Sequence, residues 1–310
     1  MALRVLNAGT YSLLVDHGRL RTRGLGVPIG GAADRAAYAL ANAMVGDGGR
    51  AVALECTLAG PTLESTGWHG GAFFGAHFDL WINDRPIGGN RTFNLEPGDV
   101  LTVGQARDGL RAYLAVPGGF ETPMCLGARS SWEPVRKNED LRCAESQLSG
   151  RFVEPDGYVL RSDLRILRGA HAGLFPDRDI CQNAYCVADE SNRMGLRLQG
   201  PALGRAAVEL VSAPVCPGTI QVVNDGMPIV LGIDAQTIGG YPRLAHVISA
   251  DLDAIAQLRP GQPVRFRWVD LDEAIHAKRD RERWLREWMT RLQMAAEASK
   301  RRLHVDGMEK

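Results

Sequence analysis

The chain has 310 residues, 45% of them apolar and 23% charged, and its 36 basic residues balance its 36 acidic ones. This composition is typical of a globular protein, and the length allows two domains of about 150 residues. Zero net charge argues against a nucleic-acid partner, and the absence of an apolar run of about 20 residues argues against a membrane partner. Residues 1–14 lack the order of a signal peptide, so we expect a cytoplasmic protein.

The first regular element predicted along the chain is a helix at residues 33–45. Asp34 lies in its first turn and Gly46 directly follows it, which matches the charge preference of a helix start and the left-handed cap of a helix end. Ala36 and Leu40 recur at helical spacing, so one face of this helix is expected in the core.

Short β-type runs dominate the rest of the chain and predict a barrel or sandwich. They lie at residues 72–74, 78–82, 100–103, 112–116, 219–223, 229–233 and 264–269. Asn224-Asp225-Gly226 between two runs predicts a tight hairpin, because Gly accepts the positive φ of the turn. Asn83-Asp84-Arg85 lacks that Gly and is a weaker hairpin signal.

The last predicted element is an amphipathic helix at residues 271–303. Trp284, Trp288 and Leu292 form an apolar stripe on it, surrounded by charged residues. The stripe packs either on the helix's own domain or on a partner protein, and the sequence leaves both open.

The same four motifs occur in the same order in both halves of the chain. The first half has Asp34-Arg35, 52–55, 83–87 and 95–100, and the second has Asn192-Arg193, 207–210, 224–229 and 258–264. Four matches in register indicate two copies of one β-rich unit. We predict a mainly β protein with a first domain at 1–135, a linker at 136–163, a second domain at 164–270 and a C-terminal helix and tail at 271–310. The cleft between like domains is the expected ligand site.

Familiar catalytic motifs are absent from the sequence. There is no GxxxxGK[ST] phosphate loop, no GxGxxG dinucleotide loop and no GxSxG nucleophile elbow. The seven histidines and six cysteines are dispersed without metal-ligand spacing, so we expect free thiols and no metal. Candidate chemistry therefore rests on polar, glycine-rich segments.

The first such segment, residues 26–35, is a glycine loop that enters the predicted helix. Backbone N–H groups at a helix start bind carboxylate or phosphate, and Arg35 adds a charged fork. The alternative, which we favour for this segment alone, is a tight turn with Asp34 as a helix-start charge and Arg35 in solvent.

Asn192-Arg193 occupies the equivalent place in the second half of the chain. Arginines from two like domains either clamp an anion between them or form ion pairs inside each domain, with Glu55 and Glu209. The matching Glu in both halves slightly favours the internal pairs.

The second segment, residues 233–242, follows a predicted strand. Its Gly-Gly pair lets the backbone approach a ligand closely, while Gln236 and Thr237 offer hydrogen bonds to an amide or carboxylate. A structural loop explains the same residues equally well. Asp34, Asp234 and Tyr241 are the candidates for a nucleophile or general base. The candidate catalytic residues are Asp34, Arg35, Arg193 and Tyr241, and the candidate substrate-binding residues are Asn192, Asp234, Gln236, Thr237, Gly239 and Gly240.

Longer motifs make most of residues 3–270 recognisable. They are DHGR from Asp16, GVPIGGAADR from Gly26, ALECTLAGPTLE from Ala53, YLAVPGGF from Tyr113, SNRMGLRLQGPAL from Ser191, PGTIQVVNDGMPIVL from Pro217 and QTIGGYP from Gln236. On these motifs the chain resembles the biotin-dependent carboxyltransferase subunit family. That family includes the C subunit of ATP-dependent 5-oxoprolinase, the antagonist of a sporulation-kinase inhibitor, and part of the urea carboxylase carboxyltransferase domain.

The resemblance implies two cyclophilin-like β-barrel domains, a B-like companion subunit of the same family and an amidase-like third subunit. It implies opening of 5-oxoproline to glutamate by a complex that uses ATP elsewhere than on this chain. Biotin enters only through the family, because the Met-Lys-Met of a biotinylation site is absent. We therefore expect the C subunit of a 5-oxoprolinase-type complex, inactive alone. The alternatives are a regulatory protein that sequesters its companion and a carboxyltransferase subunit for a urea-like substrate.

Four positions depart from the family pattern near the expected cleft. Val15 replaces a usual Gln, Gly30 a usual Ser, Asn192 a usual Asp and Ile238 a usual Thr. Each change removes a hydrogen-bonding group or a charge, and the loss of a buried partner costs about 1–3 kcal/mol. We expect either a substrate other than 5-oxoproline or weak catalysis.

Overall fold

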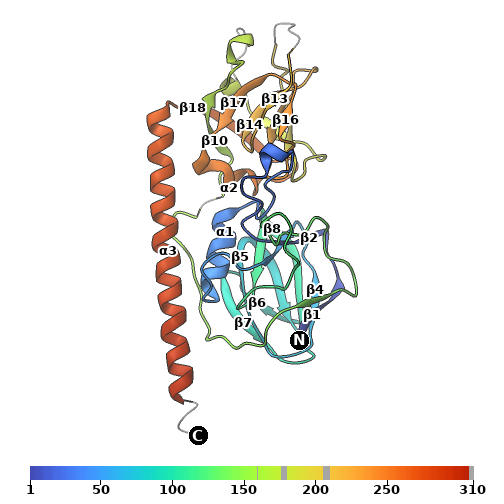
Figure 1. Cartoon of the computed structure of the whole chain (residues 1–310), viewed down its shortest axis with the longest axis vertical. Helices are drawn as coiled ribbons and strands as arrows, with labels where there is room; N and C mark the ends of the chain where they lie inside the picture. The colour runs from blue at the N-terminus through green and yellow to red at the C-terminus, as the bar shows by residue number, and fades with distance from the viewer. Residues whose placement is uncertain (159, 176–179, 205–209, 307–310) are drawn as a thin grey trace. The chain divides into compact units, whose positions relative to one another are not determined.

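The computed structural model describes residues 1–158, 160–175, 180–204 and 210–306 (Figure 1). The chain forms two compact, mainly β units, and both are discontinuous in sequence. The first unit contains Met1–Gly18, Arg35–Tyr158 and Trp284–Lys310, and the second contains Arg19–Asp34 and Val159–Arg283. The glycine loop before the first long helix therefore belongs to the second unit.

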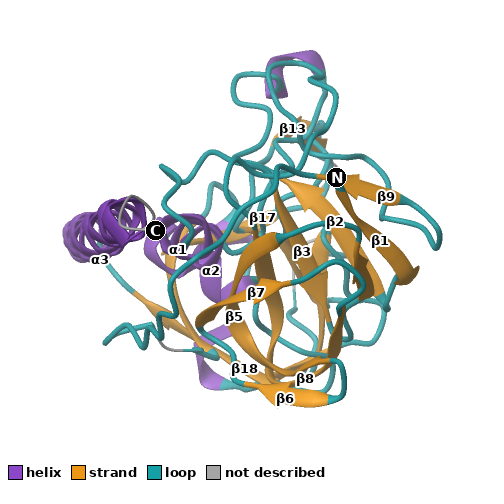
Figure 2. Ribbon diagram, turned by 90° about the horizontal axis from the view of Figure 1, so that it is seen from below, coloured by secondary structure: helices purple, strands orange, loops and turns teal. Residues whose placement is uncertain are grey.

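The first unit is built on one curled, nine-stranded sheet, and Figure 2 shows its strands curving around a shared interior. Its strands are β1 (Ala2–Asn7), β2 (Tyr11–Val15), β3 (Ala53–Thr57), β4 (Thr62–Ser65), β5 (His69–Ile82), β6 (Arg85–Ile87), β7 (Arg91–Leu95), β8 (Val100–Ala115) and β9 (Asp140–Arg142). The order along the sheet is β2-β3-β8-β4-β1-β9, and β5 connects β6 and β7 to β8. Leu3, Leu54, Leu63 and Leu114 fill the interior and are fully buried.

β5 is one continuous strand of 14 residues, where the sequence predicts two short runs. The predicted interruption falls at Gly75, whose φ is +136°. In the structure the register of β5 against β8 shifts between Gly75 and His77, so the strand bends without ending. Gly75 therefore marks a bulge inside a strand, and sequence patterning alone does not distinguish such a bulge from a turn.

The weaker of the two predicted hairpins forms without glycine. Asn83 and Asp84 both have positive φ, 49° and 64°, as a two-residue turn between β5 and β6 requires. Asn83 Nδ2 donates to Asp99 Oδ1 at 2.5 Å, and its Oδ1 accepts from the Val100 N–H at 2.9 Å. Asn tolerates the left-handed conformation, and these side-chain hydrogen bonds hold the turn in place.

The predicted helix is confirmed as α1 (Arg35–Met44), which packs against β5 and β8. Ala36, Leu40 and Met44 are fully buried, as their helical spacing indicates. Its first helical residue is Arg35, so Asp34 directly precedes the helix.

The second unit is a closed seven-stranded barrel in the order β10-β17-β14-β15-β12-β11-β18. Its strands are β10 (Asp163–Arg168), β11 (Tyr185–Val187), β12 (Gly195–Gln199), β14 (Thr219–Val222), β15 (Pro228–Leu231), β17 (Arg243–Val247) and β18 (Pro263–Trp268). A separate strand pair joins β13 (Ala213–Pro214) to β16 (Ile238–Gly239), and α2 (Leu252–Ile255) follows η4 (Ser249–Asp251). The glycine hairpin is confirmed, because β14 pairs with β15 across Gly226, whose φ is +84°.

The predicted C-terminal helix is confirmed as α3 (Leu271–Asp306). Within the second unit Arg281 pairs with Asp253 at 3.1 Å. From Trp284 onward the helix belongs to the first unit, where the indole N–H donates to the Asp156 carbonyl at 2.5 Å and Leu292 is 5% exposed. The apolar stripe therefore packs on the chain itself, one of the two alternatives that the sequence left open. Within the described residues, no helix is long and apolar enough to cross a membrane.

Candidate functional site

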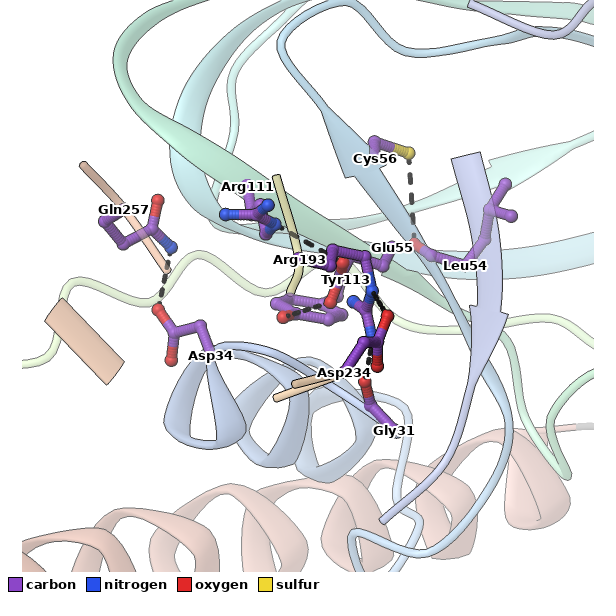
Figure 3. Close-up of polar contacts among 10 residues, drawn as sticks. All are labelled: Gly31, Asp34, Leu54, Glu55, Cys56, Arg111, Tyr113, Arg193, Asp234 and Gln257. Carbon is purple, nitrogen blue, oxygen red and sulfur yellow. Dashed lines mark hydrogen bonds and ion pairs between the residues drawn. The ribbon is translucent and has the colours of Figure 1, made fainter. Parts of the chain in front are cut away.

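The most extensive polar cluster among the predicted residues surrounds Arg193 in the second unit (Figure 3). Its Nε donates to Asp234 Oδ2 at 2.6 Å, and its Nη2 donates to Asp234 Oδ1 at 3.1 Å and to the Gly31 carbonyl at 2.7 Å. The Arg193 side chain is 6% exposed and that of Asp234 is 30% exposed. We call Arg193, Asp234 and Gly31 the Arg193 cluster. A two-point ion pair of this kind fixes both geometry and charge.

Backbone contacts hold the Arg193 cluster in place. The Asp234 N–H donates to the Arg193 carbonyl at 3.1 Å, which joins the segment after β15 to the turn before β12. The Gly30 N–H donates to the Ile233 carbonyl at 3.3 Å, which attaches the glycine loop to the same place. Gly30 and Gly31 both have positive φ, 63° and 79°, so this loop path favours glycine.

Asp34 lies at the end of the glycine loop and is 1% exposed. Gln257 Nε2 donates to Asp34 Oδ2 at 2.7 Å, and Gln257 is itself 4% exposed (Figure 3). This carboxyl, which directly precedes α1, is therefore buried and hydrogen-bonded within its unit. Sequence reasoning did not choose Gln257 as a site residue.

The second predicted segment divides into buried and exposed residues. Thr237 is 7% exposed and its carbonyl accepts from the Val215 N–H at 3.0 Å, while Gln236 is exposed and Tyr241 is 43% exposed. Gln221 Nε2 donates to the Tyr241 carbonyl at 3.3 Å. A Cβ on Gly239 would lie 2.6 Å from Gln221 Nε2, so a side chain here would displace the Gln221 amide.

Asn192 has a local role in the turn before β12. Its Oδ1 accepts from the Met194 N–H at 2.8 Å, and its side chain is exposed. This geometry is an Asx turn, in which a short polar side chain satisfies the backbone two residues on. The turn leaves Asn192 and Met194 exposed and directs the guanidinium of Arg193 inward.

A second buried carboxyl, in the first unit, was quoted in a sequence motif but not chosen as a site residue. Asp16 accepts hydrogen bonds from the Ser130 hydroxyl at 2.6 Å, the Arg129 N–H at 2.7 Å and the Gly18 N–H at 2.9 Å. Burial acts to raise the pKa of Asp16, but these hydrogen bonds outweigh it and the pKa lies below its usual value. Ser130 also lines a surface hollow of about 690 Å³ within residues 122–139.

Glu55 is buried on β3 and bonded to two neighbours on β8 (Figure 3). The Tyr113 hydroxyl donates to Glu55 Oε2 at 2.8 Å, and Arg111 Nε lies 3.4 Å from Oε1. The alternative ion pair between Arg35 and Glu55 stays a prediction. Its counterpart in the second half involves Glu209, which lies outside the described residues.

The structure gathers some of the predicted residues and separates others. Arg193, Asp234 and the 236–241 segment all belong to the barrel unit, whereas Arg35 belongs to the first unit. A paired-arginine clamp and a ligand cleft between the units therefore stay predictions. Over the described part of the chain, no group of three or more His, Cys, Asp or Glu side chains is arranged to hold a metal.

Comparison with known proteins finds a family model and relatives that match most of the chain. The family model for the carboxyltransferase domain, subdomain A and B, matches residues 25–268. The 5-oxoprolinase C subunit of Escherichia coli (strain K12) is 34% identical over 315 residues, which cover 94% of this chain and 98% of that protein.

Solved structures of two larger chains contain the same fold. The chain resembles the Kluyveromyces lactis urea amidolyase with a TM-score of 0.84 and 26% identity, over 93% of this chain and 20% of that one. It resembles TTHA0988 with a TM-score of 0.79 and 31% identity, over 86% of this chain and 55% of that one. The chain thus spans little more than half of TTHA0988 and about a fifth of the urea amidolyase.

Proposed function

The chain belongs to the carboxyltransferase domain, subdomain A and B, family, and from this membership we propose that it is the C subunit of an ATP-dependent complex that opens 5-oxoproline to glutamate. One observation carries the proposal. The match to the Escherichia coli 5-oxoprolinase C subunit runs over 94% of this chain and 98% of that protein. The urea amidolyase match, by contrast, covers a fifth of a much larger protein.

We assign substrate recognition to the exposed part of the 236–241 segment. 5-Oxoproline carries a ring amide and a carboxylate, and both are recognised by amide and hydroxyl groups. Gln236 is exposed and Tyr241 presents its ring at 43% exposure, so both side chains reach solvent beside the barrel. Gly239 and Gly240 supply backbone that a ligand can approach closely.

We assign Arg193 a positioning role in this proposal. Its guanidinium is paired with the Asp234 carboxylate, and its Nη2 donates a hydrogen bond to the Gly31 carbonyl. The Arg193 cluster therefore fixes the glycine loop and Asp234 relative to the barrel. This role differs from the predicted alternative in which Arg193 and Arg35 clamp an anion.

ATP and biotin belong to the complex in this proposal, not to a site on this chain. The donor set of the Arg193 cluster does not fit a triphosphate, because Asp234 cancels the charge of its one guanidinium. We therefore assign ATP to the companion chains, a B-like relative of this chain and an amidase-like third subunit. No step of the chemistry is assigned here to ATP or biotin.

A second candidate function is carboxyl transfer to a urea-like amide. It is favoured by the TM-score of 0.84 to the urea amidolyase, which extends over 93% of this chain. The two candidates differ in the substrate that stimulates nucleotide hydrolysis, so one assay separates them.

The test is co-expression of the chain with its companion subunits, followed by measurement of ADP release with 5-oxoproline, urea and related lactams. We expect release that depends on 5-oxoproline and falls about threefold to tenfold in Gln236→Ala, the range for one lost hydrogen bond. Gln199→Ala, an exposed glutamine at the end of β12, is the matched control and should leave turnover unchanged. Release that depends on urea supports the second candidate, and a stable complex without turnover on any substrate overturns both.

A further inference from the structure

Cys216 is an exposed cysteine with a built polar environment in the barrel unit. Its Sγ lies 3.5 Å from Thr219 Oγ1, and the same oxygen lies 3.2 Å from Nδ1 of His246. The Cys216 N–H also donates to Thr219 Oγ1 at 3.1 Å. The Cys216 thiol, the Cys216 N–H and the His246 imidazole thus converge on the Thr219 hydroxyl.

The barrel fixes this arrangement. Thr219 lies on β14 and His246 on β17, and the two residues face each other in the antiparallel register of these strands. Thr219 is fully buried. Cys216 lies two residues beyond β13, and the Thr219 N–H donates to the Cys216 carbonyl at 3.0 Å, which closes the turn between them. The thiol is therefore held by rigid strands and not by a long loop.

The charged groups that act on Cys216 favour its thiolate. A hydrogen bond with the His246 side chain outweighs burial, and together with Thr219 and the positive charges of His246 and Arg23 it lowers the pKa of the Cys216 thiol. Arg23, which contributes one of these charges, lies on η1 (Arg23–Leu25). Its Nη1 is buried and has no hydrogen-bond acceptor among the described residues, so a donor remains for a negative atom.

We propose that Cys216 is a covalent modification site, a thiol activated by His246 that reacts with small soft electrophiles, of which hydrogen peroxide is the simplest. The S–H proton passes to the His246 imidazole, and the thiolate sulfur attacks one peroxide oxygen. The S–O bond forms as the O–O bond breaks. The departing hydroxide takes the proton from the imidazolium and leaves as water, so sulfur is oxidised to a sulfenic acid and peroxide is reduced to water.

The chain contains its own controls for this proposal. Cys125 and Cys186 are also exposed and free, and in the described part of the structure no hydrogen bond joins either thiol to a histidine. Cys56 is fully buried, and burial raises the pKa of its thiol, so it is expected to be inert. Differences in reactivity between these cysteines isolate the environment of Cys216 from mere exposure.

The position of Cys216 gives its modification a structural consequence. The neighbouring Val215 N–H donates to the Thr237 carbonyl, and β13 pairs with β16. An oxygen added to the sulfur therefore lies at the start of the strand pair that carries the 236–241 segment. The reactivity itself does not depend on the proposed function, because it is measured on the sulfur.

The test is labelling of the full-length chain with iodoacetamide from pH 5.5 to 9, read at each cysteine by peptide mass spectrometry. Near pH 7 we expect Cys216 to label about five- to tenfold faster than Cys125 and Cys186, and its rate should begin to rise at a lower pH than theirs. Hydrogen peroxide followed by dimedone should trap a sulfenic acid at Cys216 first. His246→Gln should remove the advantage, whereas His276→Gln, at an exposed histidine on α3, should not.

Arg23→Gln provides a second variant outside the barrel strands. We expect it to slow Cys216 labelling about twofold to threefold and to shift its pH profile upward, because it removes one of the positive charges near the thiolate. Equal labelling of the three exposed cysteines across the pH range overturns the proposal. So does a folded His246→Gln variant whose Cys216 labels as fast as in the unmodified protein.

Discussion

Replacing Arg193 with Ala tests whether the Arg193 cluster holds the second unit together. The substitution leaves the Asp234 carboxylate without the two hydrogen bonds at 2.6 and 3.1 Å and leaves the Gly31 carbonyl without its donor at 2.7 Å. Because these contacts join the glycine loop to the barrel, their loss should destabilise this unit more than a surface substitution does.

The magnitude follows from burial on each side of the ion pair. Breaking a fully buried pair by removing one partner costs about 3–5 kcal/mol. The Asp234 side chain is 30% exposed, so water recovers part of this cost and about 2–3 kcal/mol remains. The unsatisfied Gly31 carbonyl adds about 1 kcal/mol. A total of roughly 3–4 kcal/mol corresponds to a fall in Tm of about 6–16 °C for a unit of this size.

The assay is thermal unfolding of Arg193→Ala, Asp234→Ala and the double variant, monitored by circular dichroism. Because the two partners share one interaction, the double variant should lose at least about 1 kcal/mol less than the sum of the single variants. Arg197→Ala, an exposed arginine on β12, is the control and should change stability by less than about 0.5 kcal/mol. Strict additivity, or an Arg193→Ala variant as stable as the control, refutes the reasoning.

Two further predictions concern the first unit. In a urea titration, Gly75→Ala should cost about 2 kcal/mol or more in unfolding free energy, because the added Cβ would lie 2.7 Å from the Arg111 carbonyl at a φ of +136°. Gly89→Ala, whose Cβ meets open space, is the control and should leave the unfolding free energy unchanged. Asp16 has a lowered pKa in the folded state, so its contribution is fully present above its usual value of 3.8 and is lost as the pH falls through the folded pKa. Ser130→Ala removes one cause of that lowering and should move the acid-unfolding midpoint to higher pH, and a midpoint unmoved relative to wild type would contradict this.

Sequence patterning predicted the elements whose signals are local. The helix at α1 follows from the spacing of Ala36 and Leu40, and the β14–β15 hairpin follows from Gly226, whose positive φ the turn requires. The continuous strand β5 was not predicted, because a glycine such as Gly75 occurs in bulges as well as in turns. Local propensity does not report whether the pairing partner continues past the glycine, which is a tertiary property.

The candidate site shows the same division between local and distant information. The sequence identified Arg193 and Asp234 separately, as members of two polar segments, but not as each other's partner. Their pairing joins residues 41 apart, and the contact to Gly31 spans 162 residues. Gln257, the donor to Asp34, lies 223 residues away from it and belongs to no polar motif. Partners of this kind are set by the barrel topology, so motif reasoning finds at most one side of each.

The departure at Gly30 connects this geometry to substrate choice. A Cβ at Gly30 would lie 3.1 Å from Arg19 Nη1 and 3.7 Å from Asp234 Oδ1. The Ser that the family resemblance places at this position would therefore bring a hydroxyl to the edge of the Arg193 cluster, between a cation and a carboxylate. Glycine leaves that space without a polar group, and its φ of +63° makes the conformation easy to hold. A Gly30→Ser variant that increases turnover of the assembled complex on 5-oxoproline would support a role for this hydroxyl in substrate choice, whereas a variant that loses only stability would argue against such a role.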